Sequence, residues 1–421
     1  MSVANPDSST ILTLRTPLAS RLGELFTIAA LWLSLLMSLD PLRTTDDIVA
    51  LKYLPIGLLI LSIPLFLVSG VMKKVLQIPS LNRLLILATI MIVGSIVPLS
   101  HGERLADSYL GRGLNLWAAL GGAIIASRPE SFERVARAFL VALVTASVIG
   151  MMLLVAKSLG LIYSAQGHIL HVETTFFVAG LIWLARRWPS SLLRLVIVVV
   201  LVWLAVDTGK STTLLLVGVF ILATTVADVL VRMRSSTRRD RGRSGAMNGI
   251  MVYFGLAAAS GIGWFFFRTI AERATRYEND LRAEMWADRW NKFASSPLVG
   301  QLFTDSPVYT TPYLQGLDLS THNDYLDILA SGGMVGFFLA ISIVVTILGR
   351  RRFSDLFTSS GKGMPFPSLF GFMILCYIAS ALGNPILPVP RLAVMFWFSI
   401  GAAAVYTSTL VGPVQRDVRN T

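Results

Sequence analysis

His322 is the residue of this sequence best placed to move a proton. It stands in "LDLSTHNDYLDILASGGMVGFFLA" (residues 317–340), where a polar stretch turns into a long apolar helix. We expect Ser320 or Thr321 to cap that helix, which places His322 in the first turn, where the positive end of the helix dipole opposes protonation of the ring. A neutral imidazole is what a general base requires.

Asn323, Asp324 and Tyr325 follow the histidine directly. The carboxylate of Asp324 and the hydroxyl of Tyr325 could orient the imidazole or form a hydrogen bond to a substrate hydroxyl. The alternative is that the whole cluster only caps the helix at a polar surface. We take His322 as the candidate base and the three residues that follow it as its supporting groups.

Two cations could complete such a site by holding a phosphate group. Lys210 stands in the tight hairpin "DTGKST" and Arg282 in an amphipathic stretch. Cations at a hydrocarbon boundary bind phosphate well, because little water competes for their charge. Each of these residues could instead contact a lipid headgroup or contribute only to membrane topology.

Two segments contain residue types that bind metal ions. The histidines and glutamate of "GHILHVETT" could ligate zinc, and the aspartates of "LDPLRTTDDIV" could hold a divalent cation. Histidines in loops at a membrane face and acidic outer loops are more often plain polar surface. We therefore expect no metal and no other cofactor.

The elements that must position these residues are membrane helices. Of the 421 residues 54% are hydrophobic and only 14% are charged, which is too little polar material for the surface of a soluble globule. The sequence predicts an all-α bundle of about twelve spans, each long enough to cross the hydrocarbon layer, in a single transmembrane domain over residues 1–421. The spans are expected at residues 23–39, 54–72, 84–99, 114–127, 138–156, 172–185, 191–206, 211–231, 249–267, 323–347, 366–384 and 392–411.

The distribution of lysine and arginine predicts the orientation of these spans, because both accumulate in cytoplasmic loops. With the N-terminus inside, most of the 36 basic residues fall in inner segments, among them the run "RMRSSTRRDRGRSG". Both termini are then cytoplasmic, and segment 268–321 lies outside together with His322. The net charge of +12 is explained by topology and by anionic membrane lipids, so we expect no nucleic-acid partner.

The outer segment 268–321 is the one long loop with room for chemistry. Its apolar residues recur at three- and four-residue steps, which predicts an amphipathic helix ending near Ser295, followed by a loop rich in Pro, Gly, Ser and Thr. Such a helix would lie on the membrane surface or cap a cavity between spans. We expect this extracytoplasmic loop to carry part of the active site.

At these residues the sequence resembles a known family. "HNDYLDILASGGMVG" looks like the His-Asn-x-x-Leu … Gly-x-x-Gly signature of the bacterial O-antigen ligase and O-antigen polymerase superfamily, which includes exopolysaccharide polymerases. "LRAEMWADRWNKFASSPLVG" resembles the Arg-x-x-x-Trp and Pro-Leu-x-Gly stretches before it, and "DTGKSTTLLL" takes the place of the family's Ser-Arg hairpin. Two departures are visible, because Lys210 replaces the arginine of many members and "QLF" follows Gly300 in place of the usual second glycine.

The resemblance implies a membrane glycan transferase that works without a metal. An acceptor hydroxyl would attack C1 of a glycan linked to undecaprenyl diphosphate, and the lipid diphosphate would leave with inversion. His322 would take the proton of the acceptor, while Lys210 and Arg282, with Arg391 as a weaker third, would hold the diphosphate.

Partners and location follow from the same resemblance. The acceptor would be another lipid-linked glycan in a polymerase, which Lys210 slightly favours, or lipid A core in a ligase. Membrane lipids would surround the protein in the bacterial inner membrane, with the site facing the periplasm. The alternative from another class is a transporter or flippase of lipid-linked glycans, for which ionisable residues or broken helices near the membrane midplane would be typical.

Overall fold

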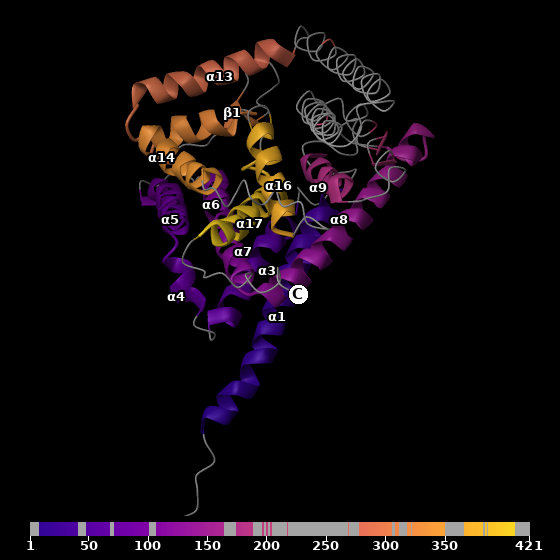
Figure 1. The fold of residues 1–421 in the computed structure, drawn as a ribbon. Coiled ribbons are helices and arrows are strands. Elements are labelled where there is room, and N and C mark those ends of the chain that lie inside the picture. Colours follow the sequence, from indigo (N-terminus) through magenta and orange to yellow (C-terminus); the bar gives the residue numbers. More distant parts are fainter. Residues whose placement is uncertain are drawn as a thin grey trace, which may run out of the picture.

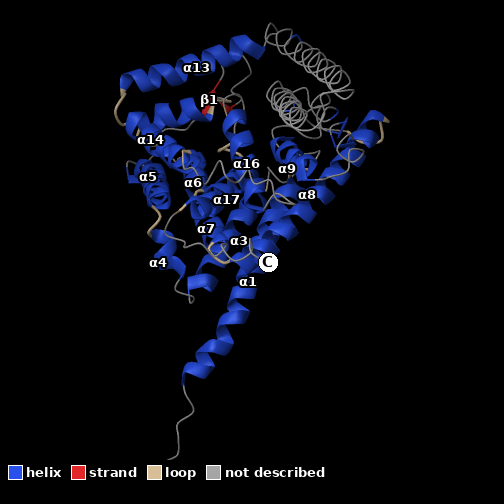
Figure 2. Cartoon of the chain, viewed as in Figure 1, coloured by secondary structure: helices blue, strands red, loops and turns tan. Residues whose placement is uncertain are grey.

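The computed structural model is a bundle of helices with a small two-stranded sheet at one end (Figures 1 and 2). The structure describes residues 8–40, 48–67, 71–100, 107–163, 174–187, 278–304, 308–310, 318–320, 322–349, 366–381, 384 and 386–408, together with positions 196, 197, 199, 200, 203, 217 and 268. The helices are α1 (Ser8–Met37), α3 (Val49–Leu67), α4 (Val71–Leu76), α5 (Pro79–Ser100), α6 (Asp107–Asn115), α7 (Ala118–Ala126), α8 (Pro129–Ser158), α9 (Thr174–Arg187), α13 (Glu278–Ser295), α14 (Asp324–Leu348), α16 (Phe366–Ser380) and α17 (Pro390–Thr407).

The expected helical class is confirmed for the described part of the chain, apart from one short ladder. β1 (Val308–Thr310) and β2 (Asp318–Ser320) pair antiparallel, with Tyr309 opposite Leu319. The sequence analysis did not predict these strands. They matter for the site because β2 ends two residues before His322 and so fixes where the chain enters α14.

Four described helices are long and apolar enough to cross a membrane. They comprise Leu18–Met37 of α1 and the whole of α5, α8 and α14. Shorter apolar helices cover Ala50–Phe66 and Phe366–Ser380. Each of these six lies on an expected span, so a membrane-spanning bundle is the coarse architecture that the structure supports.

The number of twelve spans stays a prediction. The span expected at 114–127 is divided, because α6 ends at Asn115 and α7 has only nine residues, all of them buried. A helix of that length rises about 14 Å and cannot cross the hydrocarbon layer alone. Most of the spans expected at 191–206, 211–231 and 249–267 lie outside the described residues.

The centre of the bundle is the crossing of α7 and α17. A Cβ atom added to Gly122 would lie 2.1 Å from the carbonyl oxygen of Phe398, and one added to Gly401 would lie 1.8 Å from that of Ala119. The two backbones therefore touch, as is typical of membrane helices that associate through small residues. This contact fixes the position of α17, whose first turn carries Arg391.

α14 is broken at Gly333, where φ is 59° and ψ is −162°. The break frees backbone groups that a membrane interior would leave unsatisfied. The loop 297–303 after α13 satisfies them through backbone hydrogen bonds. These bonds are Met334 N to Pro297 O at 2.9 Å, Val335 N to Leu298 O at 3.1 Å, Phe303 N to Ser331 O at 3.0 Å, and Gln301 N to Ala330 O at 3.3 Å.

The loop and the break therefore form one interlocked unit. A Cβ atom on Gly300 would lie 2.5 Å from the backbone nitrogen of Gly333, so the two backbone segments are in van der Waals contact. The "PLVG" and "GGMVG" stretches, which carry much of the family resemblance, are the two sides of this contact. The loop that follows α13 is thereby fixed against the break within α14.

Replacing Gly333 with alanine tests this contact. Its φ of 59° lies in the region that side chains disfavour, and the new Cβ would lie 2.4 Å from the carbonyl oxygen of Leu298. We expect Gly333→Ala to lower the free energy of unfolding by about 2 kcal/mol or more, measured by thermal unfolding of the purified protein in detergent. The control is Gly57→Ala in α3, where nothing lies within 4 Å of the added atom and alanine should be neutral or stabilising by up to about 1 kcal/mol. Equal unfolding temperatures for both variants would contradict the contact.

Candidate functional site

Asn323 caps the start of α14. Its side-chain oxygen accepts hydrogen bonds from the backbone N–H groups of Tyr325 and Leu326, each at 3.1 Å. The expectation that Ser320 or Thr321 caps this helix is therefore wrong. The physical reason is that β2 runs to Ser320, so the chain must turn before the helix begins and a later residue takes the cap.

His322 consequently precedes α14 instead of lying in its first turn. Its φ is 55°, in the left-handed region that residues other than glycine seldom adopt. The side chain is half-buried and its Nδ1 is shielded from solvent. Strained backbone of this kind persists where the surroundings hold it, and it clusters at functional sites.

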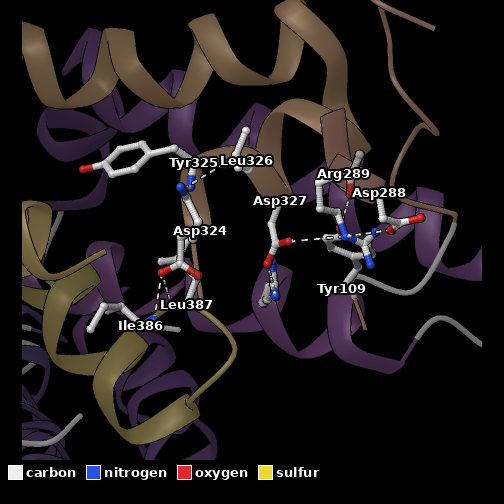
Figure 3. A network of polar contacts seen from close by, with 12 residues as sticks. Tyr109, Asp288, Arg289, Asp324, Tyr325, Leu326, Asp327, Ile386 and Leu387 are labelled. Atoms are coloured by element: carbon white, nitrogen blue, oxygen red, sulfur yellow. Dashed lines mark hydrogen bonds and ion pairs between the residues drawn. The ribbon is translucent and has the colours of Figure 1, made fainter. Parts of the chain in front are cut away.

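Asp324 ties the start of α14 to the segment before α17. Its Oδ2 accepts hydrogen bonds from the backbone N–H groups of Ile386 at 2.8 Å and Leu387 at 2.9 Å. Its own N–H donates to the carbonyl oxygen of Ala381 at 3.2 Å. Figure 3 shows the carboxylate pointing at the Ile386–Leu387 backbone. Asp324 therefore connects the start of α14 to the end of α16 and to the segment before α17.

Tyr325 adds a second link between α14 and α16. Its hydroxyl donates to the carbonyl oxygen of Ile378 at 2.8 Å. The contacts of Asp324 and Tyr325 thus go to backbone groups and not to the imidazole, so both residues support the site by holding its walls. The segment that Asp324 pins leads directly into α17, where the buried Arg391 occupies the first turn.

Asp327 carries the second buried carboxylate, one turn further along α14. Its Oδ2 accepts a hydrogen bond from Arg112 of α6 at 3.1 Å, and its Oδ1 lies 3.8 Å from Nε of Arg289 of α13. All three side chains are at most 3% exposed. Asp288 contacts Arg289 from the outer side at 3.7 Å (Figure 3). The carboxylate of Asp327 therefore bridges two buried arginines from different helices.

Tyr109 completes the link between α6 and α14. Its ring lies 5.2 Å from the guanidinium carbon of Arg112, and its hydroxyl forms a hydrogen bond with Ser331. Burial raises the pKa of the Tyr109 hydroxyl well above its usual range, so the phenol keeps its proton. Four side chains, two from α6 and two from α14, are thus joined around one ion pair.

The cluster retains unused hydrogen-bonding capacity. Nε and Nη1 of Arg112 and Oδ1 of Asp324 are buried and make no hydrogen bond within the described residues. Buried polar atoms without partners are rare in native structures and mark places where a ligand or water binds. Two donors and one acceptor are therefore available close to the start of α14.

The expected helix in segment 268–321 is confirmed, including its end at Ser295. α13 packs against α14, and its inward face carries Met285, which is 2% exposed, and the buried Arg289. Arg282 is half-buried and lies seven residues before Arg289, on the same face of the helix. The sequence pattern predicted the helix and Arg282, but not the buried Arg289 on the same face.

The other predicted site residues divide into two groups. His322, Asn323, Asp324 and Tyr325 are adjacent in the chain, and Arg391 starts the helix that Asp324 holds. Lys210 lies outside the described residues. The segments considered for metal binding also lie mostly outside them, and in the described part no three His, Cys, Asp or Glu side chains gather into a metal site.

Arg112, Arg289 and Asp327 were missed by the sequence analysis. The available signal was the pair Asp324 and Asp327, because two carboxylates three residues apart in an otherwise apolar helix lie on one face and need partners. No comparable signal marks Arg112, since its partner Asp327 lies 215 residues away in the sequence.

Comparison with family models gives no match for this chain, and no curated protein matches it either. The class that the fold supports is a helical membrane protein. Any particular activity must be argued from the residues at the start of α14.

Removing the Asp327 carboxylate should leave the buried guanidinium of Arg112 uncompensated and, among the described residues, Arg289 paired with Asp288 alone. We expect Asp327→Ala to lower the free energy of unfolding by about 3–5 kcal/mol, measured by chemical or thermal unfolding in detergent. The matched control is Glu133→Ala, which removes an exposed ion pair with Arg137 and should change stability by less than about 1 kcal/mol. If both variants unfold alike, Asp327 does not bridge the two arginines.

Proposed function

We propose that the protein is a membrane glycan transferase that moves a glycan from undecaprenyl diphosphate to an acceptor hydroxyl. The observation that carries the proposal is the position of His322. It has a left-handed backbone conformation just before α14, two residues ahead of Asp324, whose carboxylate binds the backbone that leads into the arginine-bearing start of α17. An imidazole two residues before a buried carboxylate, at the start of a helix long enough to span a membrane, fits proton transfer beside a phosphate-bearing lipid.

The proposed reaction is a single displacement. The acceptor hydroxyl loses its proton to His322 as its oxygen forms a bond to C1 of the donor glycan. The bond between C1 and the diphosphate oxygen breaks, and the lipid diphosphate leaves with the bonding electrons. The configuration at C1 inverts, because attack and departure take place on opposite faces.

Cations are needed where negative charge develops on the leaving diphosphate. Arg391 supports this role by its burial in the first turn of α17, and Arg282 by its place on the inward face of α13. Arg112 adds two buried N–H donors that have no partner among the described residues. Lys210 is the fourth proposed contact, from the sequence alone. Arginines suit this task, since their fixed fork of donors matches phosphate oxygens.

The proposed setting is the bacterial inner membrane, with both termini cytoplasmic and the start of α14 facing the periplasm. The charge distribution of the sequence supports this orientation. Of the two acceptor classes we favour another lipid-linked glycan, which makes the enzyme a polysaccharide polymerase, over lipid A core. We propose no cofactor.

A transporter of lipid-linked glycans is the second candidate, and one observation favours it. α14 is a broken helix with buried ionisable residues, which is typical of transporters. The details favour the enzyme, however. The loop 297–303 satisfies the backbone groups at the break through hydrogen bonds, which makes the broken segment rigid. Asp327 is neutralised by Arg112 and is therefore not available to bind an ion.

The base is tested with His322→Ala. Full-length protein purified in detergent is given a labelled lipid-diphosphate glycan and an acceptor, and new glycosidic bond is measured. We expect the wild type to react without any membrane and His322→Ala to lose at least about 100-fold in rate. His101→Ala, a change of another histidine, should keep the wild-type rate. Full turnover by His322→Ala would remove the proposed base, and no product from the wild type would favour transport.

The leaving-group contact is tested with Arg282→Ala in the same assay. Loss of a cation that stabilises developing charge should reduce kcat by about 100-fold. Lys292→Ala is the control on the same helix, because Lys292 pairs with Asp288 and lies nearer the end of α13. Equal rates for the two variants would show that Arg282 does not contact the diphosphate.

A further inference from the structure

A polar hollow of about 680 Å³ lies at the opposite end of the bundle from α13, between α1 and the start of α8. Figure 1 shows α13 at the top of the molecule, with α1 and the first turns of α8 side by side toward the bottom. The hollow is distinct from the site at the start of α14. Its lining combines arginines, glutamates and serine hydroxyls of the two helices.

The two glutamates of the hollow are already engaged by the same arginine. Glu24 is 5% exposed, and its carboxylate accepts hydrogen bonds from Nε and Nη2 of Arg134, both at 2.9 Å, and from Ser131 at 2.6 Å. Glu130 is 90% exposed and lies 3.8 Å from Arg134. Three arginines and two glutamates give the lining one net positive charge, and Arg21 and Arg128 are the arginines without a carboxylate at ion-pair distance among the described residues.

Arg128 is held in place by a hydroxyl and an aromatic ring, and the nearby Glu24 attracts its charge without a direct ion pair. Its guanidinium donates a hydrogen bond to the Ser20 hydroxyl and lies over the ring of Phe66, with 5.2 Å between guanidinium carbon and ring centroid. A hydroxyl and an aromatic ring position the charge but do not neutralise it. Arg21 lies at the surface beside it. Two cations are therefore available in a recess that fixes at least one of them.

The hollow lies at the membrane boundary. The apolar span of α1 begins at Leu18 and that of α8 begins at Pro129, so the lining residues lie close to the start of both spans, with Ser127 and Arg128 directly before α8. Leu18, Leu22 and Leu25 of α1 are 66%, 40% and 58% exposed. These leucines do not line the hollow, but they lie on the same turns of α1 as its residues Ser20, Arg21 and Glu24.

We propose that this hollow binds the phosphate group of an anionic phospholipid, with Arg21 and Arg128 contacting the phosphate. The acyl chains lie along Leu18, Leu22 and Leu25. Basic pockets between membrane helices at the cytoplasmic side bind acidic headgroups in this way. A free phosphate ion would use the same two cations but would gain nothing from the leucines. The bound lipid would join α1 to α8 across the recess.

The test is native mass spectrometry of the full-length protein in detergent, titrated with phosphatidylglycerol, phosphatidylcholine or inorganic phosphate. We expect tighter binding of phosphatidylglycerol than of phosphatidylcholine. Arg21→Gln should weaken phosphatidylglycerol binding about fivefold, and Arg21→Gln combined with Arg128→Gln about 25-fold. The Arg21 variant keeps the test valid if loss of Arg128 disturbs folding, because Arg21 is exposed. Arg137→Gln is the control, since Arg137 belongs to an exposed pair of α8 outside the hollow.

Three outcomes would overturn the proposal. The first is equal affinity for phosphatidylglycerol and phosphatidylcholine, because then the cations select nothing. The second is that Arg21→Gln and the double variant bind like the wild type. The third is displacement of phosphatidylglycerol by an equal concentration of inorganic phosphate, which would identify a site for free anions and remove the lipid.

Discussion

The described site depends on two buried carboxylates at the start of α14 that point in different directions. Asp324 holds the backbone before α17, and Asp327 holds Arg112 of α6 and Arg289 of α13 (Figure 3). A buried carboxylate is costly unless its charge and its lone pairs find partners, so each one dictates where its neighbours lie. Their three-residue separation places both on one side of α14. Asp324 positions α16 and α17, and Asp327 positions α6 and α13.

The broken geometry of α14 allows this arrangement in an apolar bundle. An unbroken helix would continue past Gly333 without room for the loop 297–303, whose backbone now completes the hydrogen bonds freed by the break. The loop joins α13 to the break, so Arg289 is brought to Asp327 by the same contact. Packing, backbone hydrogen bonding and charge pairing therefore support one geometry at the mouth of α14.

The sequence predicted those features that depend on local pattern. Apolar runs located the spans of α1, α5, α8 and α14, and periodicity located α13 with its end at Ser295. The cap at Asn323 was missed because the pairing of β1 with β2 follows from no local pattern. This pairing takes up Ser320, and the cap therefore falls on a later residue. The partners of Asp327 were missed for a related reason, since Arg112 and Arg289 come from segments distant in the chain. His322, Arg282 and Arg391 could be chosen by residue type, but the carboxylates that position them could not be paired before the fold was known.

We propose that a lipid diphosphate meets a base at the start of α14. The most direct test is an experimental structure of the full chain with a lipid-diphosphate glycan bound. The account predicts diphosphate oxygens within about 3 Å of guanidinium nitrogens of Arg391 or Arg282, with C1 of the glycan facing His322. A diphosphate bound at the other end of the bundle, or a bound donor with the imidazole on the far side of α14, would contradict it.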